Sequence, residues 1–340
     1  MFMFYFLLAL VLSIIFTLLI RQVALKFGFV DRPDGDRKIH QKPVALLGGT
    51  AIFLSFLLVA GYLLYWHPLY DIDIFAGKMF WVFVGGLILI ILGALDDKFN
   101  LPVKWRLVVT ALVAIIVVAG GVGLQKITNP FGGIIEINLW LLADLLVFLW
   151  LFGMMYTVKI SDGLDGLATG ICFIGAMMIY FLTTATKYYQ PNVALLSLVF
   201  AGACLGFLIF NFYPAKIFLG EGGGLFLGLM LGVLAVIAGG KVATALLVMA
   251  IPILDLGRVI YLRWRYGRSV WQGDREHLHF RLLDAGLSHP QTVLLLYAVA
   301  ALFGATTLFL QSSQKLIALM FLFLVMIAVT FWLGKSRKKA

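Results

Sequence analysis

The sequence predicts an all-α integral membrane protein with about eleven transmembrane helices in a single polytopic domain over residues 1–340. Of its 340 residues, 63% are hydrophobic and only 12% are charged, whereas soluble domains are about 45–50% apolar and about 25% charged. The hydrophobic residues form runs of about 20, the length with which an α-helix crosses a bilayer. A soluble fold has too little interior to bury this much apolar surface.

The expected spans follow one another along the whole chain. The first starts at Met1 without the basic region and cleavage site of a signal peptide, so we expect a retained helix. Pro252 is expected to bend the ninth span, because proline removes a helical hydrogen bond. In chain order, the spans are residues 2–20, 44–66, 79–95, 106–124, 139–157, 167–185, 193–210, 224–239, 242–262, 292–311 and 316–334.

Lys and Arg residues concentrate on one side of these spans. Of the 26, all but five lie after odd-numbered spans, at the adjoining helix ends, or in the C-terminal tail. Because basic loops stay in the cytoplasm, the N-terminus is predicted outside and the C-terminus inside. The net charge of +10 either only fixes this topology or also attracts membrane lipid phosphates. No nucleic-acid partner is expected. The five exceptions are Lys78, Lys126, Lys187, Lys241 and Lys315.

Two pairs of carboxylates lie at predicted cytoplasmic helix ends. Asp96 and Asp97 end a span, where acids oppose the helix dipole, and adjacent carboxylates repel unless a cation is near. Asp162 and Asp165 precede the sixth span and alternate with glycines. Asp165 either caps that helix or belongs to a phosphate site made by converging backbone N–H groups. The predicted cytoplasmic loops are 21–43, 96–105, 156–166, 211–223 and 263–291.

Two further clusters share that side. Glycines surround Glu221 and leave room for a large ligand beside the backbone, although a glycine run also marks simple turns. His277, His279 and Arg281 are typical of phosphate or nucleotide binding, with an ordinary surface loop as the alternative. Transporters place their key charges near the bilayer midplane. The pattern therefore favours an enzyme that joins a cytosolic donor to a membrane-bound acceptor, and Asp144 with Asp255 is thin support for a transporter.

Several short motifs, in a fixed order, carry a resemblance to a known family. Over nearly the whole chain they resemble the polyprenyl-phosphate N-acetylhexosamine-1-phosphate transferases of the glycosyltransferase family 4 type. The residues from Gly286 to Leu294 are similar to the GlcNAc-1-phosphate transferase branch. The motifs are Asp34-Gly35, Lys38-Ile39-His40, Lys42-Pro43, Leu47-Gly48-Gly49, Asp96-Asp97, Asp162 to Ala168, Asn211 with Pro214-Ala215-Lys216, and His277 to Leu283.

The resemblance implies a reaction and its partners. UDP-GlcNAc and undecaprenyl phosphate would give undecaprenyl-diphosphate-GlcNAc and UMP at the cytoplasmic face of a bacterial inner membrane, as the first step of a cell-envelope glycan. Mg²⁺ (or Mn²⁺) is the implied cofactor, and a homodimer would fit. Asp96 and Asp97 would activate the acceptor or organise cations, Asp162 and Asp165 would organise the diphosphate or uridine, and Glu221 would bind the metal. The implied substrate-binding residues are Lys42, Arg106, Lys159, Asn211, Lys216, His277, His279 and Arg281.

The chain departs from the family pattern at the implied metal site. Lys159 stands where Asn is usual and Glu221 where Asp is usual, and a protonated lysine repels a metal ion. Three hypotheses follow: a shifted metal site on Glu221 and the Asp residues, a Lys159 ammonium that pairs with Glu221 and takes part of the role of Mg²⁺, or a degenerate protein that only binds lipid phosphate or nucleotide. Tyr156, Arg106, Gly224 and Phe280 also differ, standing where Asn, Lys, Ser and His are common.

Overall fold

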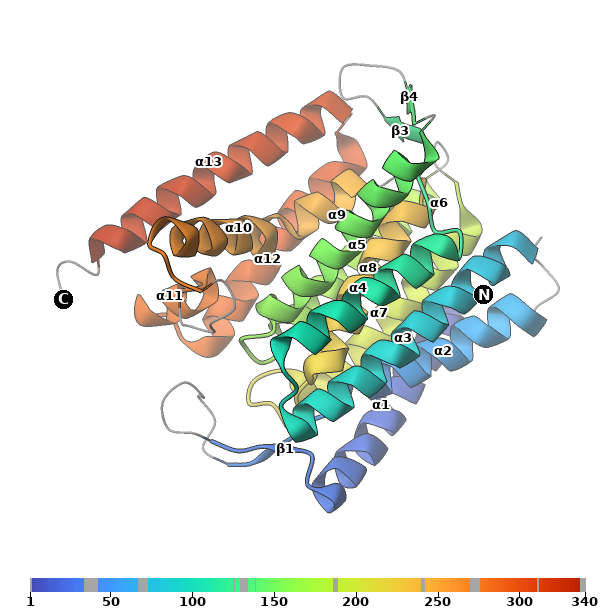
Figure 1. Ribbon diagram of the computed structural model, residues 1–340, viewed down its shortest axis with the longest axis horizontal. Helices are drawn as coiled ribbons and strands as arrows, with labels where there is room; N and C mark the ends of the chain where they lie inside the picture. The colour runs from blue at the N-terminus through green and yellow to red at the C-terminus, as the bar shows by residue number, and fades with distance from the viewer. Residues whose placement is uncertain are drawn as a thin grey trace.

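A computed structural model gives a helical fold with two short β-hairpins (Figure 1). The structure describes residues 2–33, 42–66, 73–124, 126–128, 134–137, 139–185, 189–239, 242–269, 276–310 and 312–336. Asp34-Gly35 and Lys38-Ile39-His40 lie outside these residues. The elements are α1 Phe2–Phe27, β1 Val30–Asp31, β2 Val44–Ala45, α2 Gly48–Trp66, α3 Asp73–Phe99, α4 Val103–Ala119, β3 Lys126–Thr128, β4 Ile134–Glu136, α5 Trp140–Ser161, α6 Leu167–Thr184, α7 Pro191–Asn211, α8 Glu221–Ile237, α9 Val242–Val248, α10 Ala250–Arg265, α11 Leu278–Asp284, α12 His289–Phe309 and α13 Ser312–Ser336.

The chain is a multi-pass membrane protein. Within the described residues, seven helices are long and apolar enough to cross a membrane, and the number is eight if α9 and α10 form one broken span. The predicted count of eleven is therefore not confirmed, and neither is the orientation. Helix α8 has 17 residues, fewer than the about 20 with which an α-helix usually crosses a bilayer.

The ninth predicted span is broken into α9 and α10, which meet at an angle of 74°. Pro252 lies in the first turn of α10. It has no N–H to donate to the carbonyl of Val248, and its ring would clash with that carbonyl in a continuous helix. The predicted bend is thus found, and it carries Asp255 away from the axis of α9.

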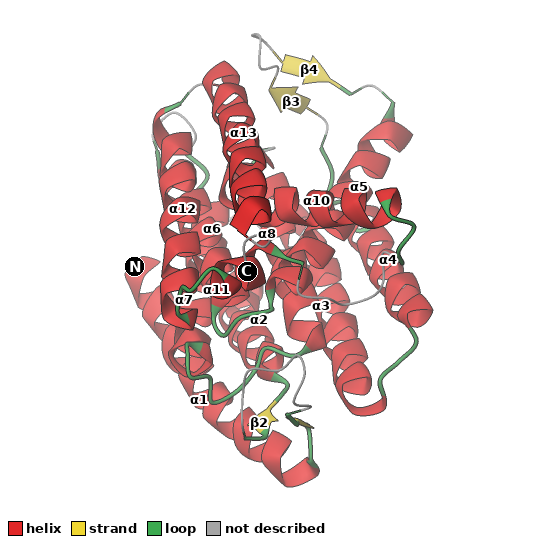
Figure 2. Cartoon of the chain, turned by 90° about the vertical axis from the view of Figure 1, so that its left-hand side faces the viewer, coloured by secondary structure: helices red, strands yellow, loops and turns green. Residues whose placement is uncertain are grey.

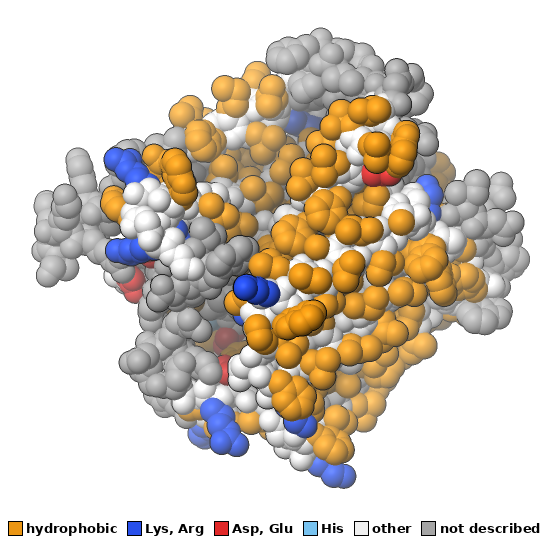
Figure 3. Space-filling model, in the orientation of Figure 1, with side chains coloured by type: hydrophobic (Ala, Val, Ile, Leu, Met, Phe, Trp, Pro, Cys, Tyr) orange, Lys and Arg blue, Asp and Glu red, His pale blue; other side chains and the backbone are white. Residues whose placement is uncertain are grey.

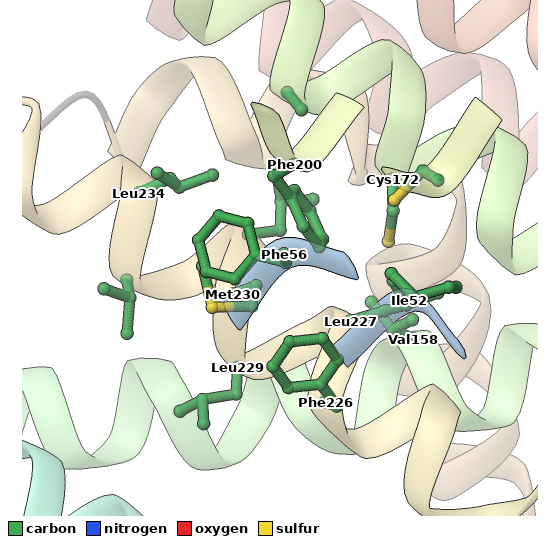
Figure 4. Close-up of a cluster of buried hydrophobic side chains, with 14 of the residues drawn as sticks. Ile52, Phe56, Val158, Cys172, Phe200, Phe226, Leu227, Leu229, Met230 and Leu234 are labelled. Atoms are coloured by element: carbon green, nitrogen blue, oxygen red, sulfur yellow. The ribbon is translucent and has the colours of Figure 1, made fainter. Parts of the chain in front are cut away.

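Helix α8 runs through the middle of the bundle. Its residues from Gly222 to Val236 are all buried, against α2, α3, α5, α6, α7 and α9. Phe226 of α8 meets Phe53 of α2 and Phe200 of α7 edge to face, with ring centroids 5.3 and 6.4 Å apart. Figure 4 shows Phe200 and Phe226 among buried hydrophobic side chains. Burial and ring contacts of this kind fix the helices relative to one another.

Apolar side chains also cover the outside of the bundle. Leu87, Ile91, Leu112 and Leu149 are each about half exposed. Figure 3 shows hydrophobic side chains over α3, α4 and α5, with Lys and Arg at the margins of this face. An apolar outer surface of this extent is what a lipid environment favours.

The two hairpins mark opposite ends of the bundle. The β1–β2 hairpin, which pairs Val30 with Ala45, lies at one end, and the β3–β4 hairpin lies at the other (Figures 1 and 2). The loop between α7 and α8 is fixed at the first end, where the backbone N of Phe218 donates to the carbonyl of Ala45 at 2.8 Å and that of Gly49 donates to Leu219 at 2.7 Å. These bonds position the residues that precede Glu221.

Candidate active site

Glycine contacts place the start of α8 against α2 and α3. A Cβ on Gly93 of α3 would lie 2.0 Å from the backbone N of Gly222, and one on Gly49 of α2 would lie 2.1 Å from the Cα of Gly223. Gly222, Gly223 and Gly224 are all buried. The interpretation that this glycine run leaves room for a large ligand is therefore wrong, because neighbouring helices fill the space.

This packing puts Asp97, in the last turn of α3, at the first turn of α8. Its Oδ1 accepts a hydrogen bond from the backbone N of Glu221 at 3.2 Å. The Asp97 carboxylate opposes the dipole of α3, as the sequence indicated. The positive end of the α8 dipole offsets that repulsion, so two helix termini share one carboxylate.

Glu221 is the centre of an ion-pair network. Its Oε1 accepts a hydrogen bond from Nη1 of Arg106 at 2.8 Å and contacts Nζ of Lys159. The same Arg106 nitrogen donates to Oδ2 of Asp96 at 3.0 Å, and the backbone N of Leu101 donates to Oδ1 of Asp96 at 2.8 Å. The exposed side-chain fractions are 8% for Asp96, 19% for Lys159 and Glu221, and 24% for Arg106. Partial burial makes these pairs stronger than surface ion pairs.

Asp162 and Asp165 lie in the turn between α5 and α6. The pKa of Asp162 is raised well above its ordinary value, first by desolvation and then by the nearby charges of Asp165, Glu221 and Asp97. Asp162 is therefore within electrostatic reach of the network. Oδ2 of Asp165 accepts a hydrogen bond from the backbone N of Ala215 at 3.0 Å, which ties this turn to the loop before α8.

Two residues that sequence analysis missed support the Asp165 turn from α12. Nε2 of His289 accepts a hydrogen bond from the backbone N of Asp165 at 3.1 Å, and the Tyr297 hydroxyl donates to the carbonyl of Gly166. The N-cap of α6 is Gly166, with no side-chain cap hydrogen bond, so the alternative that Asp165 caps α6 is wrong. Polar side chains at the start of an apolar span were the signal for His289.

Asp255 on α10 contacts the start of the histidine motif, residues His277 to Leu283. Its importance for the site was underestimated in the sequence analysis. Its Oδ2 lies 2.8 Å from Nδ1 of His277 and accepts a hydrogen bond from the backbone N of Leu278 at 3.0 Å. Its Oδ1 accepts from Nη2 of Arg258 at 2.8 Å. The sequence signal was a carboxylate inside a span close to Pro252, and such residues are functional candidates.

His279 on α11 packs against the turn that carries Asp162. A Cβ on Gly163 would lie 2.2 Å from Nε2 of His279, so a larger residue there would displace the His279 ring. In the described part of the chain, that buried nitrogen has no hydrogen-bond partner. His277 and His279 have parallel rings with centroids 5.7 Å apart, and both line a pocket together with Ser161 and Asp255.

The structure also describes the remaining predicted residues. Asn211 is buried. Its Oδ1 accepts a hydrogen bond from the Thr169 hydroxyl, and its Nδ2 donates to the carbonyl of Ile217, both at 3.1 Å. In this structure it therefore holds the loop before α8. Lys42 and Lys216 are exposed, and Arg281 on α11 is half-buried. Their substrate-binding roles stay predictions.

Comparison with known proteins decides the family. A family model described as "Glycosyl transferase family 4" matches residues 79–239. The chain is 33% identical over 329 residues to a protein of Bacillus subtilis (strain 168) named "Probable undecaprenyl-phosphate N-acetylglucosaminyl 1-phosphate transferase", covering 95% of this chain and 88% of that protein. The chain belongs to glycosyl transferase family 4. The resemblance seen in the motifs is thereby confirmed.

Other relatives of this family 4 member have related names. A Mycolicibacterium smegmatis protein named "Decaprenyl-phosphate N-acetylglucosaminephosphotransferase" is 33% identical, over 92% of this chain and 83% of its own length. An Escherichia coli (strain K12) protein named "Undecaprenyl-phosphate alpha-N-acetylglucosaminyl 1-phosphate transferase" is 28% identical, over 88% and 81% respectively. The names agree on the transferred group and differ in the polyprenyl acceptor.

The donor atoms of this family 4 chain do not fit a metal ion at Glu221. Mg²⁺ needs near-octahedral oxygen ligands. Oε1 of Glu221 already has two cationic partners, and both carboxylate oxygens of Asp96 accept hydrogen bonds. Among the described residues, no group of three or more His, Cys, Asp or Glu side chains is arranged to hold a metal ion. Mg²⁺ (or Mn²⁺) and the metal-binding role of Glu221 remain untested predictions.

The stability of this family 4 chain should depend on pH through His279. Burial lowers the pKa of His279 from 6.5 to about 3, so the folded state keeps the imidazole neutral where the unfolded chain protonates it. Unfolding then takes up a proton, and the contribution of His279 to the free energy of unfolding falls by about 2 kcal/mol between pH 7 and pH 5. We expect His279→Gln, which cannot titrate, to have a smaller drop in melting temperature between pH 7 and pH 5 in detergent. Equal drops would contradict a buried neutral histidine.

Proposed function

We propose that the chain transfers GlcNAc 1-phosphate from UDP-GlcNAc to undecaprenyl phosphate and releases UMP. The observation that carries the proposal is the ion-pair network of Asp96, Arg106, Lys159 and Glu221, which lies with Asp97 at one end of an apolar helix bundle. A lipid phosphate can reach such an end from the bilayer, and a nucleotide can reach it from solution. The printed names of the relatives support the same substrates.

The chemistry needs positioned charges more than covalent help. A phosphate monoester has its second pKa near ~6 and is mostly a dianion at pH 7, so the acceptor is already nucleophilic. In the proposal, Asp96 orients Arg106, a cation that the reacting phosphates meet, and Asp97 anchors the first turn of α8. Asp162 and Asp165 shape the donor side. Lys42, Lys216 and Arg281 are further candidates for phosphate contacts at this end.

We place the site at the cytoplasmic face of a bacterial inner membrane. The asymmetric distribution of Lys and Arg supports this orientation. A site on this side would also meet UDP-sugars, which are cytosolic substrates for an enzyme of this kind. The sequence-based expectations of a homodimer and of undecaprenyl as the acceptor chain belong to the proposal.

UMP release tests the proposal directly. The purified full-length protein, in lipid nanodiscs, is given UDP-GlcNAc with undecaprenyl phosphate, and UMP is measured with Mg²⁺ and with EDTA. We expect release that requires the lipid phosphate and that Asp97→Asn strongly reduces. The absence of release with UDP-GlcNAc, and with other UDP-N-acetylhexosamines, would refute the transferase and leave the degenerate binder.

A further inference from the structure

We infer that Lys159, together with Arg106, is the cation that the donor diphosphate meets in this chain, and that Glu221 holds Lys159 in place instead of binding a metal ion. The identity of the donor in this inference rests on the proposed function. The residues at Glu221 do not fit a metal ion, and in this inference Lys159 and Arg106 supply the positive charge there. Lys159 becomes a catalytic residue and Glu221 a positioning residue.

Lys159 is held by contacts from its own helix and from α8. It lies in the last turn of α5, and a Cβ on Gly224 of α8 would come within 3.0 Å of its Cα. Its Nζ contacts Oε1 of Glu221 and lies 5.4 Å from the centroid of the Tyr156 ring, one turn earlier. An aromatic face stabilises a neighbouring ammonium. With 19% of its side chain exposed, Lys159 is shielded from bulk water but open to a ligand.

The charge balance of the network favours a built-in cation. Lys159 and Arg106 both contact Oε1 of Glu221, and together they carry the same +2 charge as one magnesium ion. A divalent ion bound to that oxygen would lie next to both cations, and like charges at such distances repel strongly. The same two cations attract a diphosphate, because each has N–H donors besides those that contact Glu221 and Asp96.

The transfer step balances without a further ion or proton. An oxygen of the lipid phosphate forms a bond to the β-phosphorus of UDP-GlcNAc. The bond from that phosphorus to the bridging oxygen breaks, and the bridging oxygen leaves on UMP with the electron pair. Lys159 offsets the charge that grows on the transferred phosphoryl group and the bridging oxygen, a role that positioned cations fill in phosphoryl transfer.

The first test measures nucleotide binding without metal. UDP binding to the full-length protein in nanodiscs with EDTA is followed by calorimetry for the wild type, Lys159→Met and a control, Lys104→Met, which removes an exposed cation from the first turn of α4. We expect Lys159→Met to weaken UDP binding about tenfold to hundredfold and Lys104→Met to change it less than about twofold. If Lys159→Met is poorly folded, Lys159→Met with Glu221→Met replaces the ion pair by an apolar pair and takes its place.

The second test measures metal binding. The spin-resonance signal of Mn²⁺ is followed for the wild type and for Lys159→Asn, which removes the ammonium and supplies an amide oxygen that hard cations accept. We expect no stoichiometric Mn²⁺ site in the wild type and a site in Lys159→Asn. UMP release by the wild type should persist in EDTA, at a rate within about threefold of the rate with Mg²⁺. A change in rate of about threefold corresponds to only a small change in the activation free energy.

Three results would overturn the inference. They are one tightly bound Mn²⁺ per wild-type chain that Glu221→Gln removes, UDP binding by the wild type that EDTA abolishes, or equal UDP affinity in the wild type and Lys159→Met. Failure of the proposed function would give a different result, which is no UMP release under any condition. In that case UDP binding in EDTA still decides the role of Lys159, since a loss in Lys159→Met supports it and equal affinity rejects it.

Discussion

Replacing Arg106 with methionine will lower UMP release at least about 100-fold, because it removes a side chain that bonds both Asp96 and Glu221. Truncating one partner of a shielded charge pair costs about 2–5 kcal/mol, mostly because the other charge is left unpaired. Here two carboxylates lose their shared partner, and each 1.36 kcal/mol corresponds to about tenfold in rate. Steady-state UMP release in nanodiscs measures the effect.

Arg106→Lys is the matched control. Only one nitrogen of Arg106 bridges the two carboxylates, and an ammonium has three donors with which to do the same. We expect Arg106→Lys to keep its rate within about tenfold of the wild type. Melting temperatures close to the wild type for both variants would separate a lost charge from a lost fold. A fully active Arg106→Met would show that the bridge has no part in the reaction.

Apolar runs in the sequence predicted the helical fold, but they did not fix the number of spans. Apolar runs locate helices because any helix in lipid or in a buried core needs apolar sides. They do not indicate which helices cross the bilayer. Helix α8 reads as a span but has only 17 residues, with its residues from Gly222 to Val236 buried within the protein. The break before α10 could be located from Pro252, but no residue spacing predicts its angle of 74°.

The network itself was only partly predictable. One hypothesis included a pairing of Lys159 with Glu221, and that pairing is confirmed, because opposite charges at two unusual positions suggest a contact. The part of the same hypothesis in which Lys159 takes over from Mg²⁺ stays a prediction. The bridge through Arg106 joins residues 115 positions apart, and no local spacing encodes such a contact. The burial of the glycines at Gly222 to Gly224 was missed for the same reason: a glycine that admits a ligand and one that admits a helix look alike in a sequence.

Asp255→Asn will lower UMP release about 100-fold and reduce stability. The Asp255 carboxylate accepts from Arg258 and Leu278 and contacts His277, linking α10 to the start of α11. Arg258 and Leu278 donate to different oxygens of Asp255. The asparagine amide has only one oxygen, so its NH₂ group must face at least one of these donors and cannot bond it. Breaking a buried pair from one side costs about 3–5 kcal/mol. Because α11 carries His279 against the Asp162 turn, the loss reaches the candidate site.

The control for Asp255→Asn is Asp284→Asn, which changes an exposed acid at the other end of α11 and should alter the rate less than about twofold. A double-mutant cycle with His277→Asn tests the mechanism, because side chains in one hydrogen-bond network lose less together than the sum of their separate losses. Additive losses would mean that Asp255 acts without His277. A wild-type rate for Asp255→Asn would mean that α11 keeps its place without this carboxylate, and the histidine motif would then need another anchor.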